Sequence, residues 1–236
     1  MRRLGLFSLL AAIPALAACN SSAEVRYRVT LEVDDRGTPV SASSVWKLVL
    51  VKGIRGTYEA NFQGEAVALP LAGRGTLYAL LAGRTSAGKP SSYADMAMLP
   101  ERLFGGPAQA ATGRLPDHPD RIDDIRDISR RVGETAILDP AQAHQAWNDF
   151  PFLVRFTDPS DPKSVIAVNP ADLVTHFGEG VTLRGVTVTI TDDEVTAGKL
   201  GALPSFGTET GFVQWYAALT VEDPRRIGPE HFRQGM

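Results

Sequence analysis

Apolar and polar residues alternate along the chain from Glu24 to Val33. Valine, tyrosine and leucine occupy one set of alternate positions, while charged residues and threonine occupy the other. This period of two predicts a strand with one buried face and one face in water. Turn-forming residues then fill positions 34–39, and the apolar run 45–52 predicts a second, more central strand. The two strands are therefore expected to form a hairpin or to open a meander.

Later segments repeat the strand signal and contain glycines that suggest bulges or turns. In one of them Val186, Val188 and Ile190 face one way, and Gly185 shifts the phase, which suggests a bulge at that point. Further strands are expected at residues 56–71, 75–82, 152–157, 164–168, 181–191 and 212–221.

Helical signals are fewer and shorter. Isoleucines at positions 122, 125 and 128 lie on one face of a short amphipathic helix expected over residues 121–132. Residues 93–104 also look helical, although Pro100 is expected to break or kink that helix. A capping residue followed by proline marks two more helix starts. These helices are expected from Asp139 to Trp147 and from Asn169 to Phe177, the second ending at Gly178.

About eight strands and three or four short helices predict a β-rich α+β fold, either mainly antiparallel sheet or a decorated β-sandwich. A parallel doubly wound sheet is disfavoured because the strands alternate and few helices separate them. Residues 24–222 are expected to form a single globular domain, and residues 223–236 a flexible tail. The expected core on the inner faces of the strands includes Val29, Leu31, Val49, Val188, Ile190 and Leu219.

Composition and charge narrow the class of protein. Of the 236 residues, 44% are apolar and 22% are charged, which is typical of a globular chain and not of a disordered one. The net charge of −3 does not support a nucleic-acid partner, which would require a basic face. The single cysteine excludes an intramolecular disulfide framework and any multi-cysteine zinc site.

Residues 1–18 have the layout of a secretory signal peptide. Two arginines precede an uncharged apolar stretch, residues 4–18, that ends in small residues. At about 1.5 Å per residue this stretch is too short to span a hydrocarbon core of about 30 Å. A signal peptide is therefore expected in place of a transmembrane helix.

The last residues of this segment indicate which class of signal peptide it is. Leu16, Ala17, Ala18 and Cys19 resemble the lipobox of bacterial lipoproteins at all four positions. In that family the cysteine is diacylated, the signal is cleaved before it, and the new amino terminus is acylated. Three acyl chains exceed the two signals that stable anchoring needs. The alternative is a general secretory signal cut near Ala18, with the cysteine in the next position by chance.

The resemblance implies a place in the cell. Cys19 would attach the protein to the lipid bilayer of the bacterial cell envelope, with residues 19–23 as the acylated cysteine and a short polar tether. In lipoproteins an aspartate after the cysteine often retains the protein at the inner membrane. Asn20 stands there in this chain, which favours the outer membrane, with the protein facing the periplasm.

Two segments carry incomplete catalytic motifs. Residues 83–90 follow an apolar strand and match a phosphate-binding loop until Pro90, which lacks both the hydroxyl that would hold magnesium and a backbone N–H. Nucleotide binding is therefore not expected. Ser44 and Lys47 have the Ser-x-x-Lys spacing of penicillin-interacting enzymes. Residues three apart in a strand point to opposite faces, however, so an acyl-enzyme is disfavoured.

The histidines give no metal or cofactor signal. They are widely separated, none has metal-ligand spacing to another, and no Gly-x-Ser-x-Gly motif accompanies them. A catalytic triad assembled from distant residues stays open, because its members need not be close in sequence. The histidines are His118, His144, His176 and His231, of which His176 lies near a predicted helix end where a cation is favourable.

Four aspartates, one just before and three within the helix expected at residues 121–132, would share one helix face, with arginines beside them. This pattern favours a solvated face with salt bridges, and divalent-cation binding is the weaker alternative. The aspartates are Asp120, Asp123, Asp124 and Asp127.

The largest aromatic residues give a second choice between core and surface. Burial is favoured, but an exposed aromatic pair could form a platform for a ligand or for peptidoglycan. These residues are Trp46, Trp147, Phe212, Trp215 and Tyr216.

Two stretches of the body are similar to exported bacterial proteins of unknown function. One is the hairpin at residues 27–51, with the sequence Ser43-Ser44-Val45-Trp46. The other, residues 158–191, contains Asp-Pro-x-Ser-Val and Asp-Leu-x-x-x-Phe-Gly-x-Gly-Val. The resemblance implies no activity and no catalytic residue.

The sequence thus favours a membrane-anchored lipoprotein of the cell envelope that acts as a non-enzymatic binding, assembly or accessory module. Its partners would be the bilayer, through Cys19, and an envelope protein or peptidoglycan. An envelope hydrolase with a non-local catalytic site and an immunity or inhibitor lipoprotein are the alternatives. The hydrolase would bring a serine within about 3 Å of a histidine in a cleft, and the inhibitor would show an exposed aromatic patch.

Overall fold

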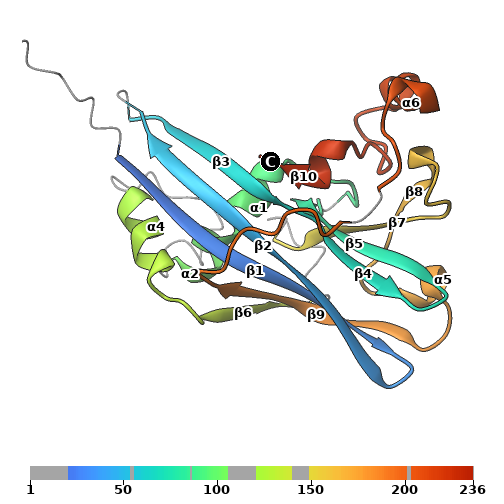
Figure 1. Cartoon of the computed structure of the whole chain (residues 1–236), viewed down its shortest axis with the longest axis horizontal. Coiled ribbons are helices and arrows are strands. Elements are labelled where there is room, and N and C mark those ends of the chain that lie inside the picture. Colours follow the sequence, from blue (N-terminus) through green and yellow to red (C-terminus); the bar gives the residue numbers. More distant parts are fainter. Residues whose placement is uncertain are drawn as a thin grey trace, which may run out of the picture.

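The predicted hairpin is the longest feature of the structure. The structure is a computed structural model, and it describes residues 21–53, 56–85, 87–105, 121–139, 149–200 and 203–235. The hairpin strands are β1 (Ser21–Asp35) and β2 (Thr38–Lys52), which pair antiparallel along their whole length (Figure 1). Between them Arg36 and Gly37 both have positive φ, the backbone of a two-residue type I′ turn. The predicted hairpin is therefore confirmed, and β1 begins earlier than the expected Glu24.

Two antiparallel sheets contain the ten described strands. The larger sheet has the order β10-β3-β2-β1-β9-β6, and the smaller has the order β4-β5-β7-β8. The predicted β-rich α+β class is confirmed, with five described α-helices where three or four were expected. The other strands are β3 (Tyr58–Glu65), β4 (Val67–Leu71), β5 (Gly75–Gly83), β6 (Thr135–Leu138), β7 (Pro151–Phe156), β8 (Val165–Ala167), β9 (Val181–Ile190) and β10 (Arg233–Gln234). The α-helices are α1 (Tyr93–Ala97), α2 (Leu99–Phe104), α4 (Arg121–Ser129), α5 (Val174–Phe177) and α6 (Phe212–Ala218).

The chain passes from one sheet to the other at a corner between β3 and β4. The strand expected at residues 56–71 is divided at Ala66, so β3 belongs to the large sheet and β4 to the small one. Gly64 precedes the corner with φ +150, and a β-carbon there would lie 2.7 Å from Cδ1 of Trp46. Only glycine lets the backbone approach the indole so closely. Strands that switch sheets commonly do so at such bends.

The inner face of the large sheet is covered by two kinds of element. The small sheet covers part of it, and α1, α2 and α4 cover the rest, so that all contribute to one apolar core. Val25, Val29 and Leu31 of β1 are buried there, as their alternation predicts. The Tyr27 hydroxyl donates a 2.6 Å hydrogen bond to the Met96 carbonyl of α1 and so ties the helical layer to the sheet.

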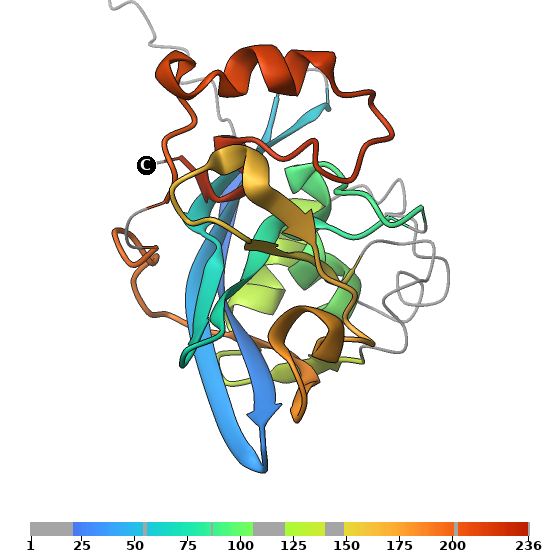
Figure 2. The same ribbon diagram turned by 90° about the vertical axis from the view of Figure 1, so that its right-hand side faces the viewer.

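The outer face of the small sheet is covered by the C-terminal part of the chain. Ile227 and Phe232 are fully buried against β5 and β7, and the Phe232 ring lies 5.7 Å from both the Tyr78 and Phe156 rings. Figure 2 shows this part, with α6, lying across one side of the molecule. The prediction of a flexible tail at residues 223–236 is therefore corrected. The described part of this segment is packed, and β10 pairs with β3.

Other predicted elements are in part confirmed and in part corrected by the structure. The strand expected at residues 212–221 is the helix α6, and Val49 and Leu219 are only half-buried where burial was expected. The break at Pro100 is confirmed, because α2 begins next to it, and the bulge at Gly185 is confirmed as a register shift against β1. The helix expected from Asn169 is only the short α5, which Gly178 ends. Residues 140–147 of another expected helix lie outside the described residues.

Candidate functional site

Glu65 is a fully buried carboxylate at the corner between the two sheets. Its Oε2 accepts hydrogen bonds from the backbone N–H groups of Lys199, at 2.8 Å, and Leu200, at 3.3 Å. Its Oε1 accepts a 2.9 Å hydrogen bond from Nε of Arg233, and Nη2 of Arg233 lies at the same distance. A buried charge is tolerated only when it is paired and hydrogen-bonded, as Glu65 is.

The backbone groups of this corner are hydrogen-bonded as well. The Glu65 carbonyl accepts hydrogen bonds from Oγ of Ser44, at 2.6 Å, and from Nε1 of Trp46, at 2.7 Å. The next residue, Ala66, donates its N–H to the Phe232 carbonyl at 2.8 Å. The corner therefore joins β2, β3, residues 199–200 and the C-terminal segment. We refer to Ser44, Trp46, Glu65 and Arg233 as the corner cluster.

The corner cluster contains Ser44 of the incomplete Ser-x-x-Lys motif. Ser44 is buried, and its hydroxyl is engaged with a carbonyl, whereas Lys47 is half-buried and has the opposite position in the alternation of β2. The lysine is therefore not placed beneath the serine, as the acyl-enzyme arrangement requires. The cluster holds chain segments together, and sequence reasoning missed Glu65 and Arg233 because they lie 168 residues apart.

A second buried ion pair joins α2 to α4. Glu101 is fully buried, and Nη2 of Arg121 binds both its carboxylate oxygens, at 3.1 and 2.8 Å. Burial raises the pKa of Glu101, and the hydrogen bond and charge of Arg121 oppose part of this rise. The Arg121 guanidinium also lies 5.2 Å from the centre of the Tyr58 ring. This pair anchors the N-terminus of α4 under the start of β3.

The aspartates of α4 face arginines. Asp123 pairs with Arg126 at 2.7 Å, and Asp127 pairs with Arg131. The hydrogen bond from Arg131 lowers the pKa of Asp127. Asp124 is half-buried, and Asp120 lies outside the described residues. Within the described ranges, no group of three histidine, cysteine, aspartate or glutamate residues is placed to hold a metal ion.

The two described histidines lie in different parts of the molecule. His231 is in the C-terminal segment, and its Nδ1 accepts the N–H of Gly228 at 3.0 Å. Burial lowers the pKa of His231, while the nearby Glu230 carboxylate opposes this. His176 is the third residue of α5, near the helix end where it was expected. His118 and His144 lie outside the described residues.

The glycine-rich loop at residues 83–90 uses its backbone internally. Thr85 donates its N–H to the Lys89 carbonyl, and Gly88 donates its N–H to the Thr85 carbonyl. The N–H of Lys89 is bound by Oγ1 of Thr85. These groups therefore do not converge on a phosphate as they do in a nucleotide-binding loop.

The aromatic residues divide between core and surface. Trp46 and Phe212 are buried, Trp215 and Tyr216 are half-buried on α6, and Trp147 lies outside the described residues. The rings of Trp215 and Tyr216 contact Phe212 at 5.6 and 5.5 Å. Val213 of α6 and Val221, three residues beyond the helix, expose 48% and 69% of their surface. Val213, the half-buried rings of Trp215 and Tyr216, and Val221 beyond the end of the helix are together called the α6 surface below.

The lipidation candidate lies just before the described chain. Cys19 is outside the described residues, and β1 starts at Ser21. In the described part of the chain, the helices are all too short or too polar to cross a membrane. No protein-family model, curated protein or solved structure matches this chain.

Proposed function

We propose that the protein is a lipid-anchored component of the bacterial cell envelope and acts as a non-enzymatic binding or assembly module. Cys19 would carry the acyl chains, and the outer membrane would hold the protein on its periplasmic face. The buried ionisable groups support the binding role over catalysis. Glu65 and Glu101 are both held by arginines that connect chain segments, an arrangement that stabilises a scaffold.

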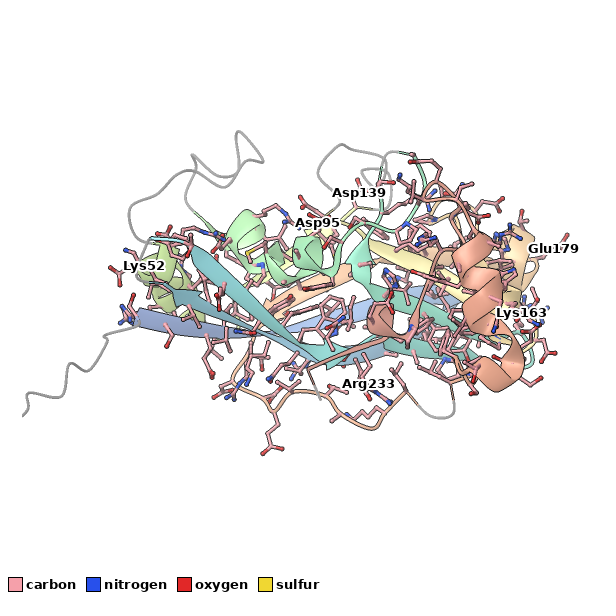
Figure 3. The ribbon with its side chains drawn as sticks, turned by 90° about the horizontal axis from the view of Figure 1, so that it is seen from above. Lys52, Asp95, Asp139, Lys163, Glu179 and Arg233 are labelled. Carbon is pink, nitrogen blue, oxygen red and sulfur yellow. The ribbon has the colours of Figure 1, made fainter. Side chains whose placement is uncertain are left out.

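The start of β1 determines how close the folded body would lie to an acylated Cys19. Because β1 begins at Ser21, only Asn20 separates the cysteine from the first strand. The end of the large sheet that contains Ser21 and its partner Lys52 would therefore lie next to the lipid headgroups. Lys52 lies at this end of the molecule, and Lys163 and Glu179 lie at the opposite end (Figure 3).

The length of the hairpin sets how far the distal end can reach. A strand of 15 residues spans about 50 Å at roughly 3.3 Å per residue. The α6 surface lies toward the end opposite the start of β1 (Figure 1). An upright protein would thus present half-exposed aromatic rings, with exposed valines beside them, to a partner in the periplasm. Aromatic residues are enriched at the centres of binding surfaces.

Palmitate labelling with Cys19→Ser tests the anchor. The variant is expected to lose the label and to accumulate as precursor or as soluble protein, while Ser21→Ala, two residues away, keeps both label and membrane fraction. Labelling that persists in Cys19→Ser would refute the anchor.

Site-specific photo-crosslinking in cells tests the binding surface. A photoreactive residue in place of Val213 on α6 is expected to give a discrete crosslinked species. The control position is Ile137 of β6, which is 75% exposed but away from α6. Equal or absent crosslinking at the two positions would contradict the α6 surface as the binding site.

A further inference from the structure

His231 lies in a turn that is closed by its own ring. The backbone N–H of Gly228 donates to Nδ1 of His231 at 3.0 Å, and the N–H of His231 donates in return to the Gly228 carbonyl at 3.1 Å. Because Nδ1 is the acceptor, the proton of the neutral ring lies on Nε2. Gly228 is buried, and only 14% of the His231 side chain is exposed. The turn is therefore closed only while Nδ1 carries no proton.

Glu230 is the charged group that faces this ring. Its Oε1 lies 3.3 Å from Nδ1 of His231, and its carboxylate also accepts a hydrogen bond from Tyr216 of α6. Other described ionisable side chains on the elements around the ring are engaged elsewhere or neutral. Arg233 of β10 is paired with Glu65, Arg226 binds backbone carbonyls at the end of α6, and Tyr78 of β5 stays neutral because burial raises its pKa.

The segment that this turn closes supports both ends of α6. The ring centre of Phe232 lies 5.7 Å from that of Phe206, which in turn lies 5.0 Å from that of Phe212, the first residue of the helix. At the other end of the helix, Arg226 donates a 2.8 Å hydrogen bond to the carbonyl of the C-cap residue. Figure 2 shows the segment and α6 on the same side of the molecule. Displacement of residues 226–232 would therefore remove the support of α6.

A proton on Nδ1 is incompatible with the closed turn. The protonated nitrogen is a donor, so two N–H groups would face each other at 3.0 Å, and the buried Gly228 N–H would lose its acceptor. The new N–H of the ring finds the Gly228 carbonyl and Oε1 of Glu230, both at 3.3 Å. Neither contact gives the Gly228 N–H a new acceptor. Opening of the turn returns that group and the charged ring to water, so protonation favours the open turn.

We propose that His231 is an acid-sensitive latch, a side chain whose contact with Gly228 holds the C-terminal segment beneath α6. At neutral pH the ring accepts the Gly228 N–H, and the segment stays packed. When the ring takes up a proton from solvent, the turn at residues 228–231 opens, Phe232 loses its fixed position, and α6 loses its support. The consequence for binding rests on the function proposed for the α6 surface: a partner bound there would be released in acid.

Hydrogen–deuterium exchange of the purified full chain in detergent tests the latch, with mass spectrometry of peptides that cover α6 and residues 226–232. Exchange is measured about one unit above and about one unit below pH 6.5, the ordinary pKa of histidine, and is corrected for its intrinsic pH dependence. One proton taken up on opening raises the opening equilibrium constant by up to about tenfold at the lower pH. Protection of both segments is expected to fall in acid by up to that factor. Unchanged protection of α6 overturns the proposal.

Two variants should move this response in opposite directions. His231→Gln keeps an acceptor for the Gly228 N–H but takes up no proton, so the loss of α6 protection in acid should disappear. Glu230→Gln removes the charge that stabilises the protonated ring in the closed turn and should increase the loss. His176→Gln, at the other described histidine, in α5, should behave like the unmodified chain.

The same variants can overturn the latch. A His231→Gln variant that still loses α6 protection in acid would place the titrating group elsewhere. If His231→Gln does not fold, Glu230→Gln decides, and a loss no greater than in the unmodified chain contradicts the proposal.

Photo-crosslinking from Val213 in cells suspended at the two pH values separates the latch from the proposed function. A crosslink that is lost in acid in the unmodified chain, and kept in His231→Gln, supports both. A crosslink absent even at neutral pH, with exchange as expected, refutes the binding surface and leaves the latch. A crosslink lost equally in the two chains overturns the control of binding by His231.

Discussion

The carboxylate of Glu65 and the guanidinium of Arg233 form an ion pair across 168 residues of sequence. One partner is fully buried at the corner between the two sheets, whereas 46% of the Arg233 side chain is exposed. The pair fastens the C-terminal strand β10 to the edge of the large sheet, beside the Glu65 carbonyl that binds Ser44 and Trp46. The C-terminus is thus part of the fold and not an appendage to it.

Removing Arg233 should destabilise the protein, because it leaves the buried Glu65 carboxylate without its partner. Arg233→Met is expected to lower the free energy of unfolding by about 2–3 kcal/mol. This is less than for a fully buried pair, because part of Arg233 stays in water. Denaturant unfolding measures the loss. Arg225→Met is the control, since the pair of Arg225 with Asp223 lies within one exposed turn and should contribute less than about 1 kcal/mol. Equal effects of the two variants would show that Glu65 does not need its partner.

The C-terminal segment should contribute to the core. Phe232 is fully buried among aromatic rings, so Phe232→Ala is expected to cost about 3–5 kcal/mol through lost burial and a cavity. Val221→Ala, at a residue that is mostly exposed, should change stability by less than about 0.5 kcal/mol. Thermal or denaturant unfolding compares the two. If Phe232→Ala were as mild as Val221→Ala, residues 223–236 would be the flexible tail that the sequence suggests.

Two glycines with positive φ should respond differently to alanine. Gly37→Ala meets open space in the hairpin turn and should cost about 1 kcal/mol for the left-handed backbone alone. Gly64→Ala also brings its β-carbon to 2.7 Å from the Trp46 indole, so about 2–4 kcal/mol is expected. The difference between the two free energies of unfolding isolates the close approach. A Gly64→Ala variant no less stable than Gly37→Ala would mean that Trp46 can move aside without loss.

His231 should make stability depend on pH. Burial lowers the pKa of His231 below its ordinary value of 6.5, so at mildly acidic pH the unfolded chain binds a proton that the folded chain does not. Its contribution is therefore fully present above pH 6.5 and is lost as the pH falls through the lower folded pKa. His231→Gln keeps an acceptor for the Gly228 N–H but cannot titrate. Unfolding at a series of pH values should show a shallower acid loss in this variant. An identical pH profile would mean that His231 titrates alike in both states.

The local sequence pattern was sufficient to predict the buried face of an element wherever one face is buried and the other is exposed to water. The alternation in β1 places Val29 and Leu31 in the core, and the isoleucines of α4 lie on its buried face, as predicted. The boundaries of some elements were also set locally: α2 begins at Leu99, one residue before Pro100, and Gly185 marks the bulge in β9. In these places the neighbours along the chain already decide which side meets water.

The tertiary structure decided what depends on distant partners. Residues 212–221 are apolar enough for either a strand or a helix, and α6 forms where Phe212 can pack on Phe206. Residues 223–236 show no period because only single residues, Ile227 and Phe232, enter the core. The partner of Glu65 is found only after the chain has folded back on itself. Periodicity reports the side of an element that faces the core, whereas a contact between residues far apart in sequence depends on the packing of the whole chain.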